Sequence, residues 1–288
     1  MKISKPEWLK ICRPKGHEII LYNQVDSLLK SHKLTTVCNE ALCPNRSACW
    51  SAGTATFMIL GDTCTRFCSF CNVKHARKGI EIDANEGVRI ANASAGLKLN
   101  YVVLTSVDRD DLPDLGANHF ANCISAIRSK ISHVKIEVLT PDFDARPELI
   151  KLVIDAKPDV FAHNIEAVER LQNIRDPRAK YRKSLEVLKI AKKINPKILT
   201  KSSIILGVGE KEEEVLQALK DLREVQVDAV VIGQYLQPSK KNLPVKEFVT
   251  PEKFQFYGKK AKELGFKFVV SEPFARTSYK ADEIFKAT

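Results

Sequence analysis

Short apolar, β-branched runs alternate with amphipathic helical patterns along most of this chain, and the alternation restricts its fold more than any other feature. Six runs recur from about residue 54 onward: Thr54–Leu60, Tyr101–Thr105, Val134–Leu139, Asp159–His163, Ile198–Leu206 and Asp228–Ile232. Helical patterns separate them, as at Asn118–Lys130, Tyr181–Ile194 and Glu210–Val225. Near-continuous apolar strands between amphipathic helices are typical of a parallel sheet covered by helices. With a short last strand near Lys267–Val270, the pattern predicts an α/β fold, a parallel (β/α)6 partial TIM-type barrel.

Polar segments follow the predicted strands and indicate where a site forms. GDTCTRFCSFC follows the first strand and SVDRDDLPDLG the second, and TPDFD, HNIE, GVGE and GQYLQPS follow the next four. In parallel barrels the active site collects at the carboxyl ends of the strands. The sequence therefore predicts a site on these loops, with three cysteines on the first of them.

The domain organisation follows from length and composition. The chain has 288 residues, 44% of them hydrophobic, so it can build a sizeable core without covalent staples. This length would allow two domains, but α/β barrels of this size are often a single domain. We predict an N-terminal extension at residues 1–50, a barrel at 51–271 and a C-terminal tail at 272–288.

Six of the eight cysteines lie in two triplets with different spacing, C-x4-C-x5-C and C-x3-C-x2-C. The two sets, in chain order, are Cys38, Cys43, Cys49 and Cys64, Cys68, Cys71. Each set is one ligand short of a closed four-coordinate site. Structural zinc usually takes four ligands in pairs such as C-x2-C, and disulfides predominate in small oxidised scaffolds. Iron–sulfur clusters fit the triplets better than either alternative. Cys123, in the apolar run ANCISAI, is interpreted as a buried small hydrophobe.

Charge and hydropathy bear on partners and location. Lys and Arg exceed Asp and Glu by 46 − 35 = 11, which suggests an acidic partner or nucleic acid. The basic residues are scattered, however, and aromatic residues make up only 7% of the chain, so a single-strand stacking platform has little support. No apolar stretch approaches the roughly 20 residues that span a bilayer. The opening MKISKPEWLK lacks a signal segment, and we expect a cytoplasmic protein.

The motifs together resemble a known family. The C-x3-C-x2-C loop after the first strand is similar to the signature of radical S-adenosylmethionine enzymes, and the chain as a whole resembles the lipoyl synthases among them. The matching stretches are TVCNEALCPN, GTATFMILGDTCTRFCSFCNV, YVVLTSVDRDDLPDLGA, PDVFAHNIEAVERL, IGQYLQPS and RTSYKAD. They run from about Thr36 to Asp282, which is nearly the whole chain.

The resemblance implies two four-iron four-sulfur clusters and S-adenosylmethionine as cofactors. Cys64, Cys68 and Cys71 would hold the catalytic cluster. Its fourth iron would bind S-adenosylmethionine, and one electron from the cluster would break a carbon–sulfur bond and release a 5′-deoxyadenosyl radical. The first triplet would hold an auxiliary cluster, which in the family is the sulfur donor. Its fourth ligand in the family is a serine that maps onto Ser278 of RTSY; without the resemblance, Ser278 would be a polar tail residue.

The resemblance also implies the substrate and partners. The reaction would insert sulfur at carbons 6 and 8 of an octanoyl-lysine on a lipoyl carrier domain, such as a 2-oxoacid dehydrogenase acyltransferase subunit or a glycine cleavage carrier protein. An electron donor such as ferredoxin or flavodoxin and a cluster carrier protein are further expected partners, and neither nucleic acid nor membrane is expected.

Three residues are candidates for contacts with the cofactor. Asn164 and Glu166 follow the fourth strand, where ribose or methionine groups could bind, although helix capping would explain them equally well. Arg178 has a bidentate fork that suits a carboxylate, and a surface ion pair is its alternative role. The roles of the charged residues 108–111 in SVDRDD cannot be assigned from the sequence.

Two other functions remain open at this stage. One is a different two-cluster radical enzyme, such as a methylthiotransferase acting on tRNA, which would need an appended nucleic-acid-binding domain. The other is a non-enzymatic module in which the cysteines hold zinc. The chain also departs from the family pattern: RTSY replaces the commoner RSSY, and Ser203 stands where glycine is frequent, which leaves details of the cofactor pocket open.

Overall fold

The computed structural model describes residues 4–10, 15–51 and 56–285, and within them a parallel sheet organises the chain. The strand order is β1-β4-β5-β6-β7-β8-β9. Neighbours pair in parallel at β1–β4, β4–β5, β7–β8 and β8–β9. The bounds are β1 (Thr56–Ile59), β4 (Tyr101–Ser106), β5 (Lys135–Leu139), β6 (Val160–Ala162), β7 (Leu199–Leu206), β8 (Ala229–Gln234) and β9 (Phe268–Ser271). The predicted parallel α/β fold is confirmed, with a strand in each predicted run.

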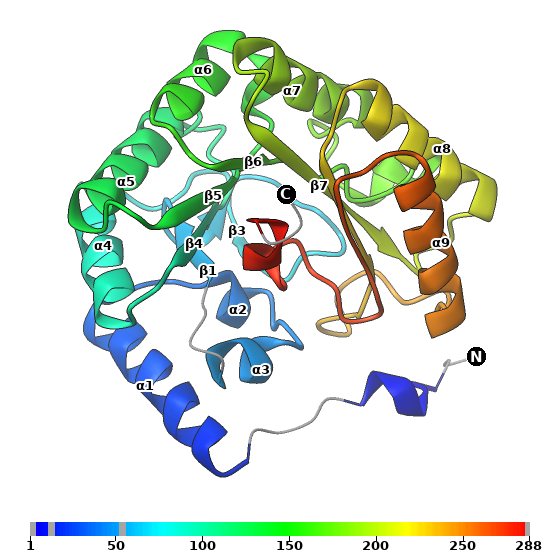
Figure 1. The fold of residues 1–288 in the computed structure, drawn as a ribbon, viewed down its shortest axis with the longest axis horizontal. Helices are drawn as coiled ribbons and strands as arrows, with labels where there is room; N and C mark the ends of the chain where they lie inside the picture. The colour runs from blue at the N-terminus through cyan, green and yellow to red at the C-terminus, as the bar shows by residue number, and fades with distance from the viewer. Residues whose placement is uncertain (1–3, 11–14, 52–55, 286–288) are drawn as a thin grey trace. The chain divides into compact units, whose positions relative to one another are not determined.

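Helices alternate with these strands, as Figure 1 shows. They are α1 (His17–Ser31), α2 (Val37–Glu40), α3 (Arg46–Ser51), α4 (Glu86–Gly96), α5 (Ala117–Lys130), α6 (Pro147–Asp155), α7 (Tyr181–Ile194), α8 (Glu212–Glu224) and α9 (Pro251–Glu263). Short 3-10 helices occur at η1 (Glu7–Leu9), η2 (Phe143–Ala145), η3 (Glu169–Ile174) and η4 (Ala281–Phe285). The predicted helix at Tyr181–Ile194 has the observed bounds. The first predicted helix differs from α5 by one residue at its start, and the last differs from α8 by two residues at its start and one at its end.

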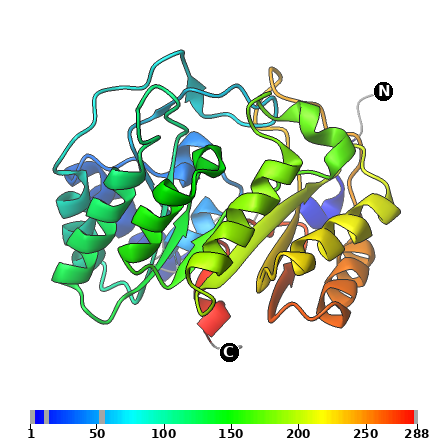
Figure 2. The same ribbon diagram turned by 90° about the horizontal axis from the view of Figure 1, so that it is seen from above.

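The chain forms two compact units, which we describe separately. The N-terminal unit comprises Ile11–Phe67 and Asn72–Phe161, and the C-terminal unit comprises Met1–Lys10, Cys68–Cys71 and Ala162–Thr288. In the N-terminal unit, α5 packs between α4 and α6, and the three helices lie beside one another in Figure 2. The central residues of β4 and β5 are buried, so the two strands belong to the core of this unit.

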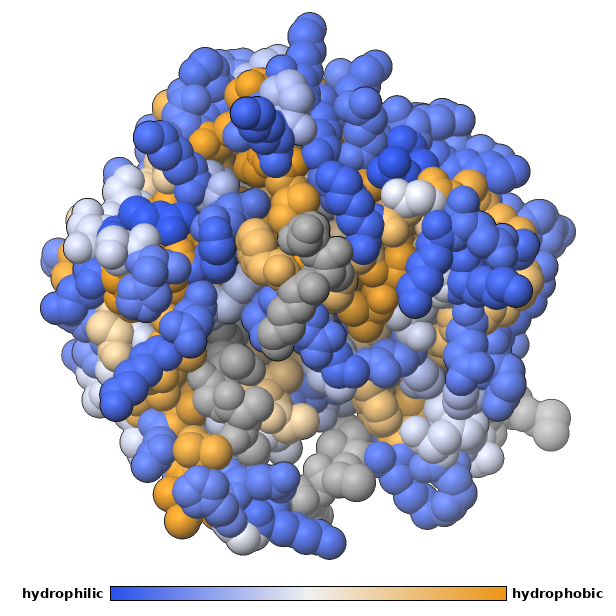
Figure 3. Space-filling model, viewed as in Figure 1, coloured by the Kyte–Doolittle hydropathy of each residue, from blue (hydrophilic) through white to orange (hydrophobic). Residues whose placement is uncertain are grey.

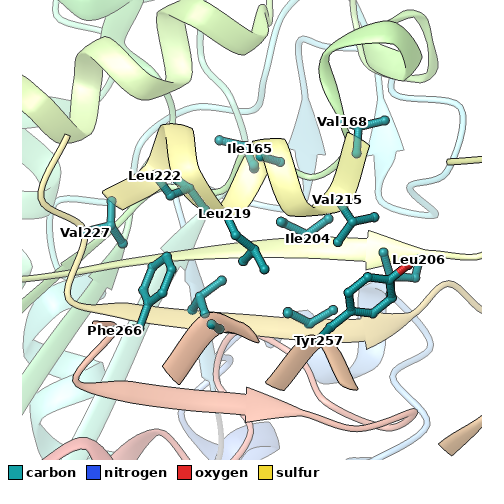
Figure 4. Close-up of a cluster of buried hydrophobic side chains, with 14 of the residues drawn as sticks. Ile165, Val168, Ile204, Leu206, Val215, Leu219, Leu222, Val227, Tyr257 and Phe266 are labelled. Atoms are coloured by element: carbon teal, nitrogen blue, oxygen red, sulfur yellow. The ribbon is translucent and has the colours of Figure 1, made fainter. Parts of the chain in front are cut away.

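The core of the C-terminal unit lies between β7, β8 and three helices. Apolar side chains of α7, α8 and α9 meet those of the two strands in one cluster, part of which is drawn in Figure 4. Leu219 and Leu222 of α8 and Ile204 of β7 have no exposed surface. Amphipathic helices bury one apolar stripe in this way and leave the opposite face to water. Figure 3 accordingly shows hydrophilic side chains over much of the outer surface in that view.

Strand and helix ends depart from the sequence expectation where side chains bind the backbone. The first two residues of the predicted strand Thr54–Leu60 lie outside the described residues, and the strand ends at Ile59 because Leu60 adopts a φ of 67°. The eighth helix begins at Glu212 rather than Glu210, because the Glu210 carboxylate accepts the backbone N–H groups of Gly207, Val208 and Gly209. This capped turn connects β7 to α8.

Among the helices that the structure describes, none combines the length and apolar content that crossing a membrane requires. Cys12 lies outside the described residues, and each of the seven described cysteines is a thiol rather than half of a disulfide. Cys123 on α5 has no exposed surface, as its apolar neighbours predict. The disulfide alternative therefore has no support within the described residues.

Candidate functional site

The first cysteine of the second triplet lies in a short parallel pair that sequence reasoning missed. Cys64 ends β2 (Thr63–Cys64), which pairs with β3 (Lys74–His75). The backbone N–H groups of Arg66 and Asp108 point at the Cys64 sulfur, with N···Sγ distances of 3.4 and 3.3 Å. The Cys64 thiol also lies 3.7 Å from the Asp108 carboxylate, so the sulfur has fixed polar contacts on the loop after β4.

The segment Cys68–Cys71 is held by two other loops of the C-terminal unit. The Asp176 N–H lies 3.3 Å from Cys68 Sγ, and the Ser69 N–H donates to the Ile174 carbonyl at 2.8 Å. On the other side, the Asn242 amide donates to the Cys71 carbonyl at 2.7 Å. The segment is therefore fixed by the loops after β6 and β8, at the carboxyl ends of those strands.

The first triplet lies next to β1 in the N-terminal unit. Cys38 is buried on α2, and Cys43 follows it in a turn in which the Cys43 N–H donates to the Cys38 carbonyl at 3.1 Å. An antiparallel bridge between Thr36 and Phe57 joins the start of α2 to β1. Cys49 lies on α3, where its N–H donates to a carbonyl of the preceding turn.

Burial favours the neutral form of the Cys38 thiol. Burial raises the pKa of Cys38, a hydrogen bond from the backbone of Thr56 opposes the shift, and the neighbouring Cys43 raises it further. A coordinating metal ion would lower the pKa of such a thiol instead, because the cation favours the thiolate that binds it.

Asn164 and Glu166 lie together and contact the C-terminal motif. The Asn164 amide donates to the Glu166 carboxylate and to the Thr277 hydroxyl, both at 2.9 Å. Glu166 has a φ of 63°, which is unusual for a non-glycine residue, and its N–H and carbonyl both bond to β7. Burial raises the pKa of Glu166, while Arg175, Asn164 and Arg276 act against the shift. Thr277 precedes Ser278, so the predicted cofactor residues and the RTSY turn are neighbours.

Arg178 is placed close to the second triplet through one aspartate. Its guanidinium donates to both oxygens of Asp176 at 2.8 and 3.0 Å, and the N–H of the same Asp176 points at Cys68. The guanidinium of Arg178 is thus paired with the Asp176 carboxylate near the cysteine segment. Its contact with a cofactor stays a prediction.

Sequence reasoning also missed a buried cluster below the cysteine loop. The Glu86 carboxylate accepts the Leu60 N–H at 2.9 Å and lies 2.7 Å from Nε2 of His119, and the Cys123 sulfur lies nearby. Glu86 and His119 belong to different helices, so no spacing in the sequence could reveal the pair. Their contacts fix Leu60 at the exit of β1, four residues before Cys64.

Comparison with known proteins decides the family. Residues 58–222 match the model of the radical SAM superfamily. The chain is 49% identical to the lipoyl synthase of Methanocella arvoryzae over 97% of its own length and 94% of that protein. It is 49% identical to the mitochondrial lipoyl synthase of Drosophila melanogaster over 99% of its own length and 76% of that protein.

The chain belongs to the lipoyl synthase family. As a member of the family it is a radical SAM enzyme of the sulfur-inserting kind, with a four-iron four-sulfur cluster and S-adenosylmethionine as its cofactors. A solved structure of the hydrogenase maturase HydG has the same fold, with a TM-score of 0.58 at 12% identity, over 92% of this chain and 66% of that one.

The residues of the second triplet have surroundings that suit the ligands of an iron–sulfur cluster. Cys64 and Cys68 each have backbone N–H groups directed at their sulfur atoms, as expected around a cluster ligand. Backbone N–H donors suit the thiolate ligands of zinc as well as those of a cluster, so the family membership, with its radical chemistry, decides between the two. The structural zinc alternative is therefore set aside.

Proposed function

We propose that this chain converts a protein-bound octanoyl-lysine into the lipoyl group by inserting sulfur at carbons 6 and 8. The observation that carries the proposal is the near full-length 49% identity to lipoyl synthases, together with both cysteine triplets and RTSY in one chain. The structure supports it further, because the loop of the second triplet follows β1, at the end of the strand where α/β sites form.

Cys64, Cys68 and Cys71 are the proposed ligands of the cluster that binds S-adenosylmethionine. When bound, this pair of cofactors supplies a 5′-deoxyadenosyl radical, which takes hydrogen from an unactivated carbon. The chain's own contribution is to hold the three thiolates and to direct N–H groups at two of them. These backbone N–H groups stabilise negative charge on the sulfur atoms directly, without a water molecule.

A second, auxiliary cluster is the proposed sulfur donor, with Cys38, Cys43, Cys49 and Ser278 as its ligands. A serine oxygen is a harder ligand than a thiolate and is less favoured by iron. Its position would therefore be the first to open as sulfur is withdrawn. The contact between Thr277 and Asn164 supports a defined place for the RTSY turn rather than a loose tail.

Asn164, Glu166 and Arg178 are the proposed contacts of S-adenosylmethionine. Asn164 and Glu166 present an amide and a carboxylate after β6, which suit the amino and ribose groups of that cofactor. Arg178 suits its carboxylate, if the guanidinium exchanges Asp176 for the ligand.

The proposed substrate is an octanoylated lipoyl carrier domain of a 2-oxoacid dehydrogenase or of glycine cleavage, and an acidic carrier would complement the net charge of +11. We also predict a ferredoxin or flavodoxin as reductant and a cluster carrier protein as a partner. The domain boundaries at residues 50 and 271 and a cytoplasmic location likewise stay predictions.

The test is an anaerobic reaction of the reconstituted protein with reductant, S-adenosylmethionine and an octanoyl-lysine peptide. We expect 5′-deoxyadenosine, and a peptide in which two hydrogen atoms are replaced by two sulfur atoms, both followed by mass spectrometry. Deoxyadenosine without any change in the peptide would contradict the substrate and leave another radical enzyme, such as a tRNA methylthiotransferase. The absence of both products would favour a metal-binding module.

A further inference from the structure

The charged segment Asp108–Asp111 of SVDRDD forms two separate sets of ion pairs. Asp108 and Asp110 contact Arg66 in the cysteine loop, whereas Arg109 and Asp111 pair with each other. Alternate residues therefore make different contacts, at the point where the chain enters a turn that the Leu112 N–H closes on the Arg109 carbonyl. This accounts for a run of charges to which the sequence alone assigns no role.

Arg66 is almost fully buried and lies among three carboxylates. Its guanidinium donates to both oxygens of Asp142 at 2.8 Å and to Asp110 at 2.9 Å, and Asp108 lies 3.4 Å away. The side chain of Arg66 is 5% exposed and that of Asp142 is fully buried. Burial alone would lower the pKa of Arg66, but Asp142, Asp108 and Asp110 outweigh it and raise the pKa.

The three carboxylates come from loops that follow neighbouring strands. Cys64 and Arg66 follow β1, Asp108 and Asp110 follow β4, and Asp142 follows β5. Burying a cation costs several kcal/mol unless it is paired with good geometry. The bidentate contacts supply that geometry, and they require all three loops to be in place at once.

Thr65 ties the same two loops together through the backbone. Its N–H donates to the Asp108 carbonyl at 2.9 Å, and its hydroxyl accepts the Asp110 N–H at 2.9 Å. The Asp108 N–H in turn is directed at Cys64 Sγ. The position of the Cys64 sulfur is thus coupled to the contacts of Arg66, two residues away.

Arg109 fixes the other end of the loop. It donates to the Leu60 carbonyl at 3.2 Å and to both oxygens of Asp111, which accepts the Gly79 N–H at 3.2 Å. A Cβ added at Gly79 would lie 2.3 Å from the Arg109 side chain, so the segment after β3 can approach only without a side chain there. Both ends of the segment from Leu60 to Arg66 are therefore held.

We propose that Arg66 is a positioning residue: clamped by Asp108, Asp110 and Asp142, it fixes the position of the Cys64 sulfur for cluster binding before any iron is present. The inference rests on the proposed ligand role of Cys64, and it adds that the chain provides a preformed ligand. Arg66 acts through Cys64 and the loop, and touches neither substrate nor cofactor in this account. We call these four residues the Arg66 clamp. Its one guanidinium and three carboxylates give a formal net charge of 1 − 3 = −2, and the Asp108 carboxylate lies 3.7 Å from Cys64 Sγ.

The first test needs no cluster. In the apo form of the full chain, hydrogen exchange of the amides at Thr65 and Asp110 is compared for the parent, Arg66→Gln, Arg66→Lys and Asp110→Asn. The matched control is Arg182→Gln, which removes an equally bidentate but exposed arginine–carboxylate pair with Glu169. We expect exchange to rise at least about tenfold in Arg66→Gln, less in the two conservative variants, and not at all in the control. Unchanged exchange in Arg66→Gln would overturn the proposal.

The second test measures one cluster in isolation. Replacing Cys38, Cys43 and Cys49 by alanine leaves only the second triplet, and reconstitution should then give about four irons per chain. We expect Arg66→Gln to reduce this content severalfold, while Arg182→Gln keeps it. In chains that retain a cluster, Arg66→Gln should shift its midpoint potential to more negative values and Asp110→Asn to more positive values. Arg66→Lys should leave it near that of the parent, because the charge remains.

The outcomes separate the clamp from the proposed function. Shifts of the midpoint potential with opposite sign in Arg66→Gln and Asp110→Asn support the clamp. A merely structural defect would not move the potential in opposite directions. Shifts of the same sign, or full cluster content in Arg66→Gln, would overturn it. If the parent binds no iron, the proposed function fails, and the exchange measurement still decides whether the loop is preformed. Where Arg66→Gln does not fold, as shown by circular dichroism, Asp110→Asn carries the same comparison.

Discussion

Replacing Cys64 by alanine should abolish cleavage of S-adenosylmethionine, with a loss of more than about a hundredfold. Loss of an outer-shell partner alone typically costs 10–100-fold in metal affinity or activity, and Cys64 is a proposed direct ligand. The variant leaves two of three thiolates, and it leaves the N–H groups of Arg66 and Asp108 with no sulfur to stabilise. The measurement is 5′-deoxyadenosine formed per chain under anaerobic conditions.

Cys123→Ala is the matched control for this prediction. It also removes a thiol from the N-terminal unit, but from the interior of α5, outside both triplets. We expect it to retain the cluster spectrum and the cleavage activity. Cleavage by Cys64→Ala at the level of Cys123→Ala would contradict the role of the second triplet.

Replacing Cys43 by alanine should separate the two activities instead of removing both. Cys43 lies in the first triplet, in the turn after α2, whereas the contacts of Cys64, Cys68 and Cys71 involve other loops. The variant should therefore keep part of the deoxyadenosine formation and lose sulfur insertion into the octanoyl peptide. Both products can be followed in one reaction by mass spectrometry.

An equal loss of both activities in Cys43→Ala would count against separate cluster roles. Because α2 is joined to β1 through Thr36 and Phe57, a folding defect could reach the cysteine loop. The iron content of the second triplet in this variant distinguishes the cases. A retained second cluster with no cleavage would contradict the account, and retained cleavage without sulfur insertion is the expected result.

The strands and the location of the second triplet were predictable because they depend on local patterns. Buried strands such as Tyr101–Ser106 are continuous apolar runs, and the loop after each strand is polar, so the order of elements follows from periodicity. The two-residue strands at Cys64 and His75 are too short to leave a periodic pattern. They form because the loop folds back on itself, which depends on contacts elsewhere.

The partners of the charged residues could not be predicted, because each pair joins segments far apart in sequence. Arg66 meets Asp142 only when β1, β4 and β5 align their carboxyl ends, and Glu86 meets His119 only when α4 packs on α5. Asn164 likewise meets Thr277, 113 positions away. Without the fold, SVDRDD is a run of charges; with it, its three aspartates and its one arginine have defined contacts.

An isotope experiment on the origin of the inserted sulfur tests whether the auxiliary cluster is the sulfur donor. The clusters are rebuilt with isotopically heavy sulfide, free sulfide is removed, and the protein reacts once with an octanoyl-lysine peptide, S-adenosylmethionine and reductant. Our account predicts a lipoyl peptide in which both sulfur atoms carry the heavy isotope, with none formed by Cys43→Ala. A lipoyl product containing only light sulfur, or equal labelling in Cys43→Ala, would contradict the auxiliary cluster as sulfur donor.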